Sequence, residues 1–178
     1  MTEFEGSKTQ ENLEKAFCAE SKARNKYTYF SSVAKKEGYN QIAQIFEETA
    51  NNEKEHAKVW FKLLSGIKNT EKNLEDSIKN EHYEWSEMYV EYANTAQKEG
   101  FLDIAKLFRE ILSIEKSHEE RYQKLLDNIK ENKVFKDTKK NYWHCANCGY
   151  IHYGMNAPEI CPFCKHPQSY FERKADNY

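Results

Sequence analysis

Two short motifs of the form Glu-x-x-His have the composition and spacing of metal ligands. They are Glu53 with His56 and Glu115 with His118. Side chains three residues apart lie on one face of a helix, so each motif presents a carboxylate oxygen and an imidazole nitrogen together. Both motifs continue an apolar stripe with helical spacing, which places them on the inward side of their helices. We therefore expect them to bind metal inside a helical protein.

Two other helical segments also place carboxylates on their apolar side. Glu20 interrupts the stripe of the first segment and Glu81 that of the third, with Glu84 one turn further on. A buried, unpaired carboxylate costs several kcal/mol, whereas four carboxylates balance the charge of two divalent cations. One Glu from each of two helices with Glu-x-x-His from two others is the ligand pattern of ferritin-like di-iron bundles. The predicted catalytic and metal-binding residues of the bundle are Glu20, Glu53, His56, Glu81, Glu84, Glu115 and His118.

The alternative is that these are surface residues whose helical phase is misjudged. For a single Glu-x-x-His motif, in a chain of which 31% is charged, that alternative would be preferred. Here the motif occurs twice in register, within segments 34–56 and 96–118 that align at a constant offset of 62 residues. Each copy also has an inward Glu on the preceding helix. The repeat therefore favours metal ligands over surface side chains.

The third helix is expected to contain one extra residue. Glu81 precedes the Glu of the second motif by 34 residues, whereas Glu20 precedes the Glu of the first by 33. An extra residue in a helix is accommodated by a π-bulge, which is common at functional sites. Glu84 can then supply an additional anionic ligand, and we hypothesise that it replaces His56 when the metal pair is oxidised. Identical ligands in reduced and oxidised crystals would refute this exchange.

Four of the five cysteines form two Cys-x-x-Cys pairs near the end of the chain. Four thiolates at this spacing make a tetrahedral site for zinc or iron, and spacing alone favours a zinc ribbon. The flanks change that preference, because Cys-x-x-Cys-Gly-Tyr and Ala-Pro-x-x-Cys-Pro-x-Cys resemble a rubredoxin centre. Aromatic residues are expected to pack around this centre: Trp143, Tyr150, Tyr153, Phe163 and Phe171. The predicted ligands are Cys145, Cys148, Cys161 and Cys164, whereas Cys18 is expected to be a packed helical thiol.

The expected fold is mainly α, with a small second domain. No proline occurs between residues 10 and 130, and glycines at 38, 66 and 100, each expected to close a helix in a left-handed cap or turn, separate four amphipathic helices. These helices span about 9–37, 40–65, 70–98 and 102–130. We expect a ferritin-like di-iron four-helix bundle over 1–130, a polar linker over 131–141 and a rubredoxin-like metal-bound domain of strands and loops over 142–178.

The composition argues against two classes of partner. The formal net charge is −2, and Lys and Arg are dispersed among Asp and Glu, so nucleic acid is not expected to bind. No apolar run approaches the length that spans a bilayer, and the first residues lack the apolar core of a signal peptide. We therefore expect a soluble cytoplasmic protein that binds neither nucleic acid nor membrane.

The two parts of the chain together resemble rubrerythrin over essentially the whole length. The matching stretches are AFCAESKARNKYTYF, EKEHAK, EHYEWSEMY, EKSHEERY and the terminal rubredoxin motif. The resemblance implies a cytosolic non-haem di-iron peroxidase that takes electrons through its rubredoxin-type iron and reduces hydrogen peroxide to water in oxidative stress defence. It implies two iron ions in the bundle and one on the cysteines, where zinc is possible in preparations. It also implies rubredoxin or an NAD(P)H-dependent flavoprotein reductase as the electron donor. Carried over by position, the iron pair is bound by Glu20, Glu53, Glu81, Glu115 and His118 with either Glu84 or His56.

Two other functions fit parts of the sequence. A ferritin-class iron-handling protein would oxidise ferrous iron with oxygen, but it has no need of a one-electron relay such as the cysteine domain. A zinc protein with structural metal at both sites would be colourless, whereas ferric iron on four thiolates is red. Comparing turnover with peroxide and with oxygen separates the first rival, and an absorption spectrum separates the second.

The connection between the second and third helices is short. About six residues, Ser65 to Thr70, join them, whereas longer rubrerythrins have an extended connection. In a ferritin-like bundle these helices run parallel, so the connection must climb roughly 30 Å, and six residues reach only about 20 Å. We therefore predict a domain-swapped homodimer, in which helices one and two of one chain complete a bundle with helices three and four of the other.

Overall fold

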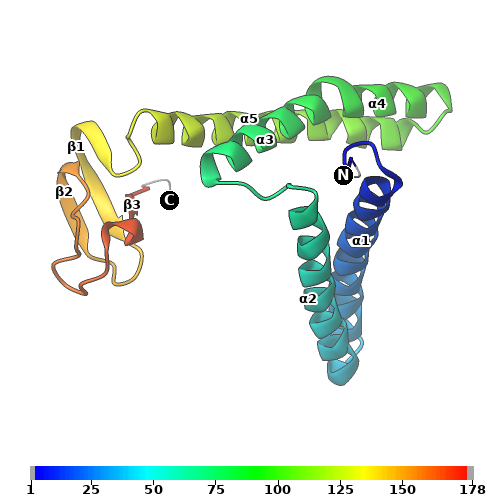
Figure 1. The fold of residues 1–178 in the computed structure, drawn as a ribbon, viewed down its shortest axis with the longest axis horizontal. Helices are drawn as coiled ribbons and strands as arrows, with labels where there is room; N and C mark the ends of the chain where they lie inside the picture. The colour runs from blue at the N-terminus through cyan, green and yellow to red at the C-terminus, as the bar shows by residue number, and fades with distance from the viewer. Residues whose placement is uncertain (1–2, 176–178) are drawn as a thin grey trace. The chain divides into compact units, whose positions relative to one another are not determined.

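The computed structural model describes residues 3–175 and divides the chain into two compact units, Met1–Lys68 and Asn69–Tyr178. The first unit is a helical hairpin, and the second contains a second helical hairpin followed by a small sheet (Figure 1). The mainly α fold class and the small strand domain after the helices are confirmed.

The first unit consists of α1 (Lys8–Lys36) and α2 (Asn40–Leu63), which pack against each other along their length. Ser7 caps α1, because its hydroxyl accepts the backbone N–H of Gln10 at 3.1 Å. Small residues seven positions apart on α2 are buried against α1 and allow the two helices to approach closely; they are Ala43, Ala50 and Ala57.

The helices of the second unit repeat this hairpin with one interruption. They are α3 (Thr70–Tyr83), the π-helix η1 (Glu84–Met88), α4 (Tyr89–Lys98) and α5 (Leu102–Lys130). The backbone N–H of Tyr89 donates to the carbonyl of Glu84, which is the wide turn of a π-helix. The extra residue predicted in the third helix is therefore confirmed, and α1 contains no such interruption.

The glycines that separate the helices behave as expected at two of three positions. Gly38 and Gly100 have φ of +86° and +89°, the left-handed conformation that closes a helix. The expectation is wrong at Gly66, because Ser65 adopts the left-handed conformation there, with φ of +57°. Gly66 is required for a different reason: a Cβ at this position would lie 2.0 Å from the ring of Phe61.

Each hairpin leaves uncovered part of the apolar stripe that its Glu-x-x-His motif continues. Ile45 of α2 is 56% exposed and Leu107 of α5 is 63% exposed, although both occupy core positions of the expected bundle. Ile42 and Ile104 are exposed as well. A two-helix hairpin can bury only the residues on its seam, so these stripes require a further helical surface to cover them.

The remainder of the second unit is a three-stranded antiparallel sheet of order β2-β1-β3. Its strands are β1 (Lys136–Cys145), β2 (Ile151–Asn156) and β3 (Phe171–Arg173), and a short 3-10 helix, η2 (Gln168–Tyr170), precedes β3. Strand β1 starts within the segment 131–141 expected to be an unpatterned linker, so residues 136–141 belong to the sheet instead. The alternation of β1 was hidden in sequence by its lysines, which lie on exposed positions.

The aromatic shell predicted around the cysteines is only partly present. Trp143 and Phe171 are buried with the cysteines, and Tyr150 packs against them. Tyr153 and Phe163 are 55% and 75% exposed, so their predicted packing around the centre is wrong. Tyr153 lies on the outward face of β2, and Phe163 lies at the tip of the second Cys-x-x-Cys turn, where side chains project into solvent.

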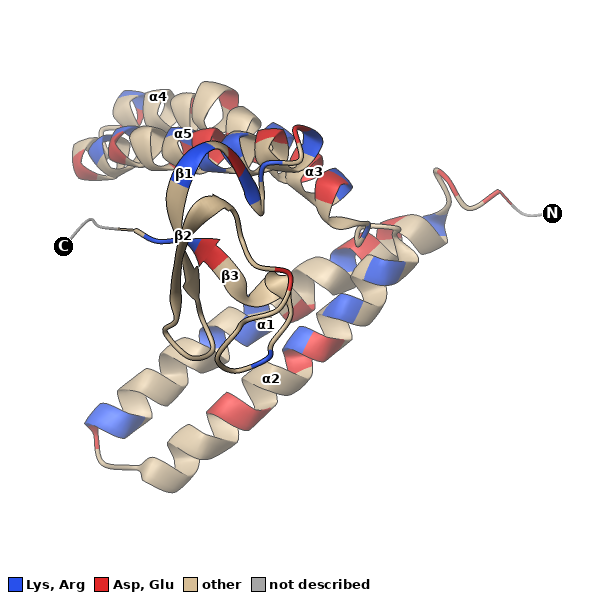
Figure 2. Cartoon of the chain, turned by 90° about the vertical axis from the view of Figure 1, so that its left-hand side faces the viewer, with Lys and Arg blue, Asp and Glu red and all other residues tan. Residues whose placement is uncertain are grey.

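Charged residues of both signs alternate along the surfaces of the helices (Figure 2). This dispersion agrees with the small net charge of −2. Within residues 3–175, none of the helices is both long enough and apolar enough to cross a lipid bilayer.

Candidate metal centres

The first hairpin brings three predicted ligands together. Glu20 projects from α1, and Glu53 and His56 project from α2, with one ligand atom of each residue within 4.8 Å of the others. Nδ1 of His56 lies 2.8 Å from a carboxylate oxygen of Glu53. Bonds of about 2.1 Å to a common cation would place such atoms at most about 4.2 Å apart, so small side-chain movements suffice for them to share one ion.

The second hairpin forms an equivalent group. Glu81 of α3 lies with Glu115 and His118 of α5, again with ligand atoms within 4.8 Å of one another. Nδ1 of His118 is 2.8 Å from Glu115 and 3.5 Å from Glu81. Glu115 is only 8% exposed, which makes this group the more enclosed of the two. The repeat detected in the sequence is thus a repeat of ligand groups as well as of helices.

The carboxylates of the second group show what a cation would contribute. Burial raises the pKa of Glu81 above its ordinary value of 4.5, and a hydrogen bond and the negative charge of Glu115 raise it further. Two neighbouring carboxyl groups share a proton in this way when no cation compensates their charge. The donor set of two carboxylates and one imidazole in each hairpin therefore fits a divalent metal ion.

Glu84 stands apart from both groups. It is the first residue of η1, and one of its carboxylate oxygens accepts a hydrogen bond of 2.6 Å from the side-chain amide of Asn80. Its charge nevertheless contributes to the raised pKa of Glu81. Of the seven residues predicted for the bundle, the structure thus gathers six into two groups of three and leaves Glu84 hydrogen-bonded beside the second.

The four paired cysteines form the third group. Sγ atoms of Cys145 and Cys164 are 3.7 Å apart, as are those of Cys148 and Cys161. A tetrahedral metal with bonds of about 2.3 Å to sulfur requires sulfur atoms about 3.8 Å apart, so the sulfur positions fit one ion. Cys18, which was expected to be packed, is exposed on α1 and lies outside this cluster.

The thiols cannot all ionise without a cation. The backbone N–H of Tyr150 lowers the pKa of Cys148, but burial and the neighbouring sulfur atoms outweigh it and raise that pKa to about 12. The backbone N–H of His166 is the main reason that the pKa of Cys164 falls to about 5. The opposite shifts reflect four crowded sulfur atoms, and a bound cation allows all of them to be thiolates.

The structure adds residues that the sequence reasoning missed. Burial raises the pKa of Tyr89, and the charges of Glu84, Glu115 and Glu81 raise it further. Tyr89 follows Tyr27 at the repeat offset of 62, which is the signal that could have identified it. The structure also shows a hydrogen bond from the indole N–H of Trp85 to the carboxylate of Glu119. The repeat in the sequence does not indicate this second contact.

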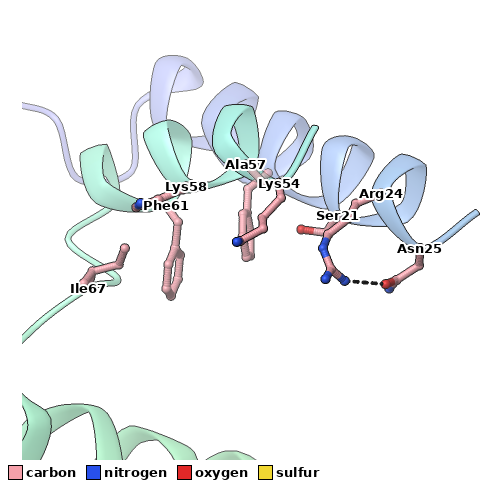
Figure 3. A pocket seen from close by; sticks show the side chains of 9 residues that line it. Ser21, Arg24, Asn25, Lys54, Ala57, Lys58, Phe61 and Ile67 are labelled. Atoms are coloured by element: carbon pink, nitrogen blue, oxygen red, sulfur yellow. Dashed lines mark hydrogen bonds between the residues drawn. The ribbon is translucent and has the colours of Figure 1, made fainter. Parts of the chain in front are cut away.

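The grooves of the two hairpins lie away from the ligand groups. A groove of about 380 Å³ on the first hairpin is lined by Phe17, Phe61, Arg24 and Lys54, among other residues, and by none of the three ligands there. Figure 3 shows Phe61, Lys54 and Arg24 extending from the two helices toward this groove. Glu53 and His56 instead follow the helical spacing of Ile42 and Ile45, so they lie on the face of α2 that carries the uncovered apolar stripe.

We expect the metal-free protein to lose stability as the pH rises across the titration of Glu81. Its folded pKa lies above the unfolded one, so the folded state holds the proton longer, and stability present below about pH 4.5 is lost as the pH rises through the folded pKa. Thermal unfolding of metal-free protein from pH 4 to 8 measures this loss. Glu81→Gln should flatten the pH dependence, and an unchanged slope in that variant would contradict the assignment.

These features define a class of protein: a ferritin-like di-iron carboxylate protein joined to a rubredoxin-like centre with four cysteines. Comparison with known sequences agrees. The sequence model of the rubrerythrin family matches residues 11–126, and that of the rubredoxin-like domain of rubrerythrin matches residues 143–172. The chain belongs to the rubrerythrin family, whose members are oxidoreductases with iron cofactors.

Individual relatives match over the full length. Rubrerythrin-1 of Clostridium acetobutylicum is 48% identical over 195 aligned residues, covering 100% of both chains. Rubrerythrin of Nitratidesulfovibrio vulgaris is 44% identical over 191, also covering 100% of both. A solved structure of nigerythrin in a partially reduced state is 30% identical, covers 97% of this chain and 90% of that chain, and gives a TM-score of 0.36. Family membership connects the protein with oxidative stress defence and with rubredoxin-type electron transfer, and relatives of this kind form oligomers.

Proposed function

We propose that this protein is a non-haem di-iron peroxidase that reduces hydrogen peroxide to water with electrons delivered through its four-thiolate iron. The observation that carries the proposal is the presence in one chain of two Glu, Glu, His groups and a four-cysteine cluster. A pair of iron ions would supply the two electrons that peroxide requires, and the single iron on the cysteines would return electrons one at a time. The combination suits reduction of a two-electron oxidant more closely than iron storage does.

The roles of individual residues follow from their positions. We assign Glu20, Glu53 and His56 to one iron and Glu81, Glu115 and His118 to the other, with carboxylates able to bridge. The four carboxylates neutralise the charge of two ferrous ions. Glu84, already near Glu81, is the residue we propose to replace His56 when the pair becomes ferric, because an added negative charge favours the higher oxidation state.

The cysteine domain would act as the electron entry point. Backbone N–H groups directed at Cys148 and Cys164 stabilise negative charge on sulfur. Cys145 and Cys161 are fully buried, which keeps water from part of the centre.

The proposed donor is rubredoxin or an NAD(P)H-dependent flavoprotein reductase, and the proposed location is the cytoplasm. The boundaries 1–130 and 142–178 remain predictions, with the strand beginning at Lys136 extending the second domain toward the bundle.

The competing function is oxidation of ferrous iron by oxygen. Reduced protein should be mixed with peroxide or with oxygen, using reduced rubredoxin as donor, and donor oxidation followed at several oxidant concentrations below saturation. We expect the second-order rate with peroxide to exceed that with oxygen by at least about 100-fold, or roughly 2.7 kcal/mol in activation free energy. Equal rates, or iron mineralisation with oxygen, would favour the ferritin-class alternative.

We further propose that a complete iron pair takes ligands from two chains in a domain-swapped homodimer. The link between α2 and α3 comprises residues 64–69, and its first part is used to close α2, since Gly66 donates to the carbonyl of Phe61 at 2.9 Å. This leaves still fewer residues to climb the roughly 36 Å length of a 24-residue helix. The uncovered apolar stripes of both hairpins supply the surface for such an exchange.

A mixed dimer tests the exchange directly. One chain carries Glu20→Ala with Glu53→Ala, the other carries Glu115→Ala with His118→Ala, and the two are unfolded, mixed and refolded with iron. In a swapped dimer one bundle then combines two intact halves, so the mixed dimer should regain about half of the parent activity per dimer. Each variant refolded alone is the control and should be inactive. A mixed dimer without activity, or a monomer with full iron content by light scattering, would exclude the swap.

A further inference from the structure

The second hairpin carries a side-chain network on its π-helix. Glu119 of α5 lies between His82 and Trp85: one carboxylate oxygen is 3.1 Å from Nδ1 of His82, and the other accepts a hydrogen bond from the indole N–H of Trp85. The ammonium of Lys116 lies 5.5 Å over the Trp85 ring. The side chain of Glu119 is only 22% exposed. One carboxylate thus connects α5 to two positions that flank the start of η1.

The first hairpin has no counterpart of this network. At the repeat offset of 62, Glu119 corresponds to Ala57, a buried residue on the seam between α1 and α2. Trp85 corresponds to Arg24 or Ala23, depending on where the extra residue is placed, and neither has an indole. The α1 helix is uninterrupted, whereas the hairpin with the network contains the π-helix. The hairpin that has a carboxylate at this position, Glu119, is therefore also the hairpin that contains the π-helix η1.

The network acts on the π-helix and lies outside the ligand group. Glu119 neighbours His118 in sequence but lies in a groove with Trp85 and Lys116, whereas Glu81, Glu115 and His118 form the ligand group. π-helical turns are rare and occur often at functional sites, so a side-chain bond that ties one to a neighbouring helix can matter for the site. Trp85 follows Glu84 directly, so a bond that fixes the indole also restrains the backbone that carries the Glu84 side chain.

We propose that Glu119 is a positioning residue that holds η1 against α5 through Trp85 and so fixes the backbone from which the Glu84 side chain extends beside the metal group. The inference rests on the proposed function only in giving Glu84 a place beside the iron pair. In this structure the carboxylate of Glu84 accepts a hydrogen bond from Asn80, and it would leave that bond to reach the iron pair. If η1 is held in place, only the side chain of Glu84 has to move.

The test uses the full-length, iron-loaded protein and four variants. Trp85→Phe removes the donor, Glu119→Leu removes the acceptor, Glu119→Gln keeps an acceptor, and Glu120→Gln alters the exposed neighbour in the same groove. Hydrogen exchange of the amides of residues 84–89 is measured by mass spectrometry. We expect exchange about 10-fold faster in Trp85→Phe and Glu119→Leu and parent-like exchange in Glu119→Gln and Glu120→Gln.

The reduction potential of the iron pair gives a second readout. It should become more positive in Glu119→Leu and return toward the parent value in Glu119→Gln, because a displaced Glu84 adds less negative charge to the ferric pair. The potential of the four-thiolate iron in the same molecule is the internal reference and should not change. Parent-like exchange and potential in Glu119→Leu, or equal changes in Glu120→Gln, would overturn the proposal. Neither readout uses peroxide, so a failure of the peroxidase assignment is recognised separately.

Discussion

Replacing Glu115 by Ala is expected to remove one iron of the pair while leaving the four-thiolate iron in place. Glu115 is 8% exposed and contacts both other members of its group, with Nδ1 of His118 at 2.8 Å. Without it, one carboxylate and one imidazole remain in that hairpin, too few ligands to hold an ion against water. Iron content should fall from about three per chain to about two, and peroxide turnover, which needs both ions of the pair, should fall at least about 100-fold.

The control for this prediction is Glu110→Ala on the same helix. The side chain of Glu110 is 58% exposed and its ion pair with Lys106 is long, at 3.7 Å, so its loss should change neither iron content nor turnover. The red absorption of the cysteine iron reports in both variants whether the rest of the chain is folded. Full iron content with undiminished turnover in Glu115→Ala would refute the assignment of Glu115 as a ligand.

Replacing Cys161 by Ala should separate the two halves of the reaction. Cys161 is fully buried, with its sulfur 3.7 Å from that of Cys148, and three remaining thiols cannot complete a tetrahedral site. The red absorption should disappear, and steady-state turnover with reduced rubredoxin should fall at least about 100-fold. Protein reduced chemically beforehand should still consume one equivalent of peroxide per iron pair, because the bundle ligands are intact.

Cys18→Ala is the matched control, since it removes an exposed thiol outside the cluster and should leave the spectrum and turnover unchanged. Steady-state turnover that survives the loss of Cys161 would show that electrons reach the iron pair without the cysteine domain. The proposed relay would then be wrong even if the peroxidase reaction itself were observed.

The ligand types and their grouping within each hairpin could be read from the sequence because they depend on short spacings. Residues three apart share a helical face, which is why His118 lies beside Glu115. The comparison of 33 with 34 residues identified the extra residue near Glu81, and the structure places η1 directly after it. The left-handed glycines at 38 and 100 follow from the same local geometry.

The failures concern features set by contacts distant in sequence or by side-chain direction. Ser65 takes the left-handed conformation that was expected at Gly66, and a Cβ at Gly66 would meet the ring of Phe61, a contact that helix-capping rules do not contain. Phe163 is expected in the aromatic shell only because it is an aromatic residue next to the cysteines in sequence. In the structure its side chain lies exposed at a turn. The lysines of β1 concealed a strand, because they are exposed and interrupt the apolar alternation, and only pairing with β2 and β3 shows that the segment is extended.

The sequence by itself determined which atoms can bind metal, since ligand chemistry resides in residue type and helical spacing fixes which residues share a face. Only the tertiary structure decided how those faces are used. It showed that Glu84 is hydrogen-bonded to Asn80 beside its group, and that Glu119 joins Trp85 across two helices. Contacts between helices depend on how their surfaces meet, and spacing along one helix carries no information about the partner that will lie against it.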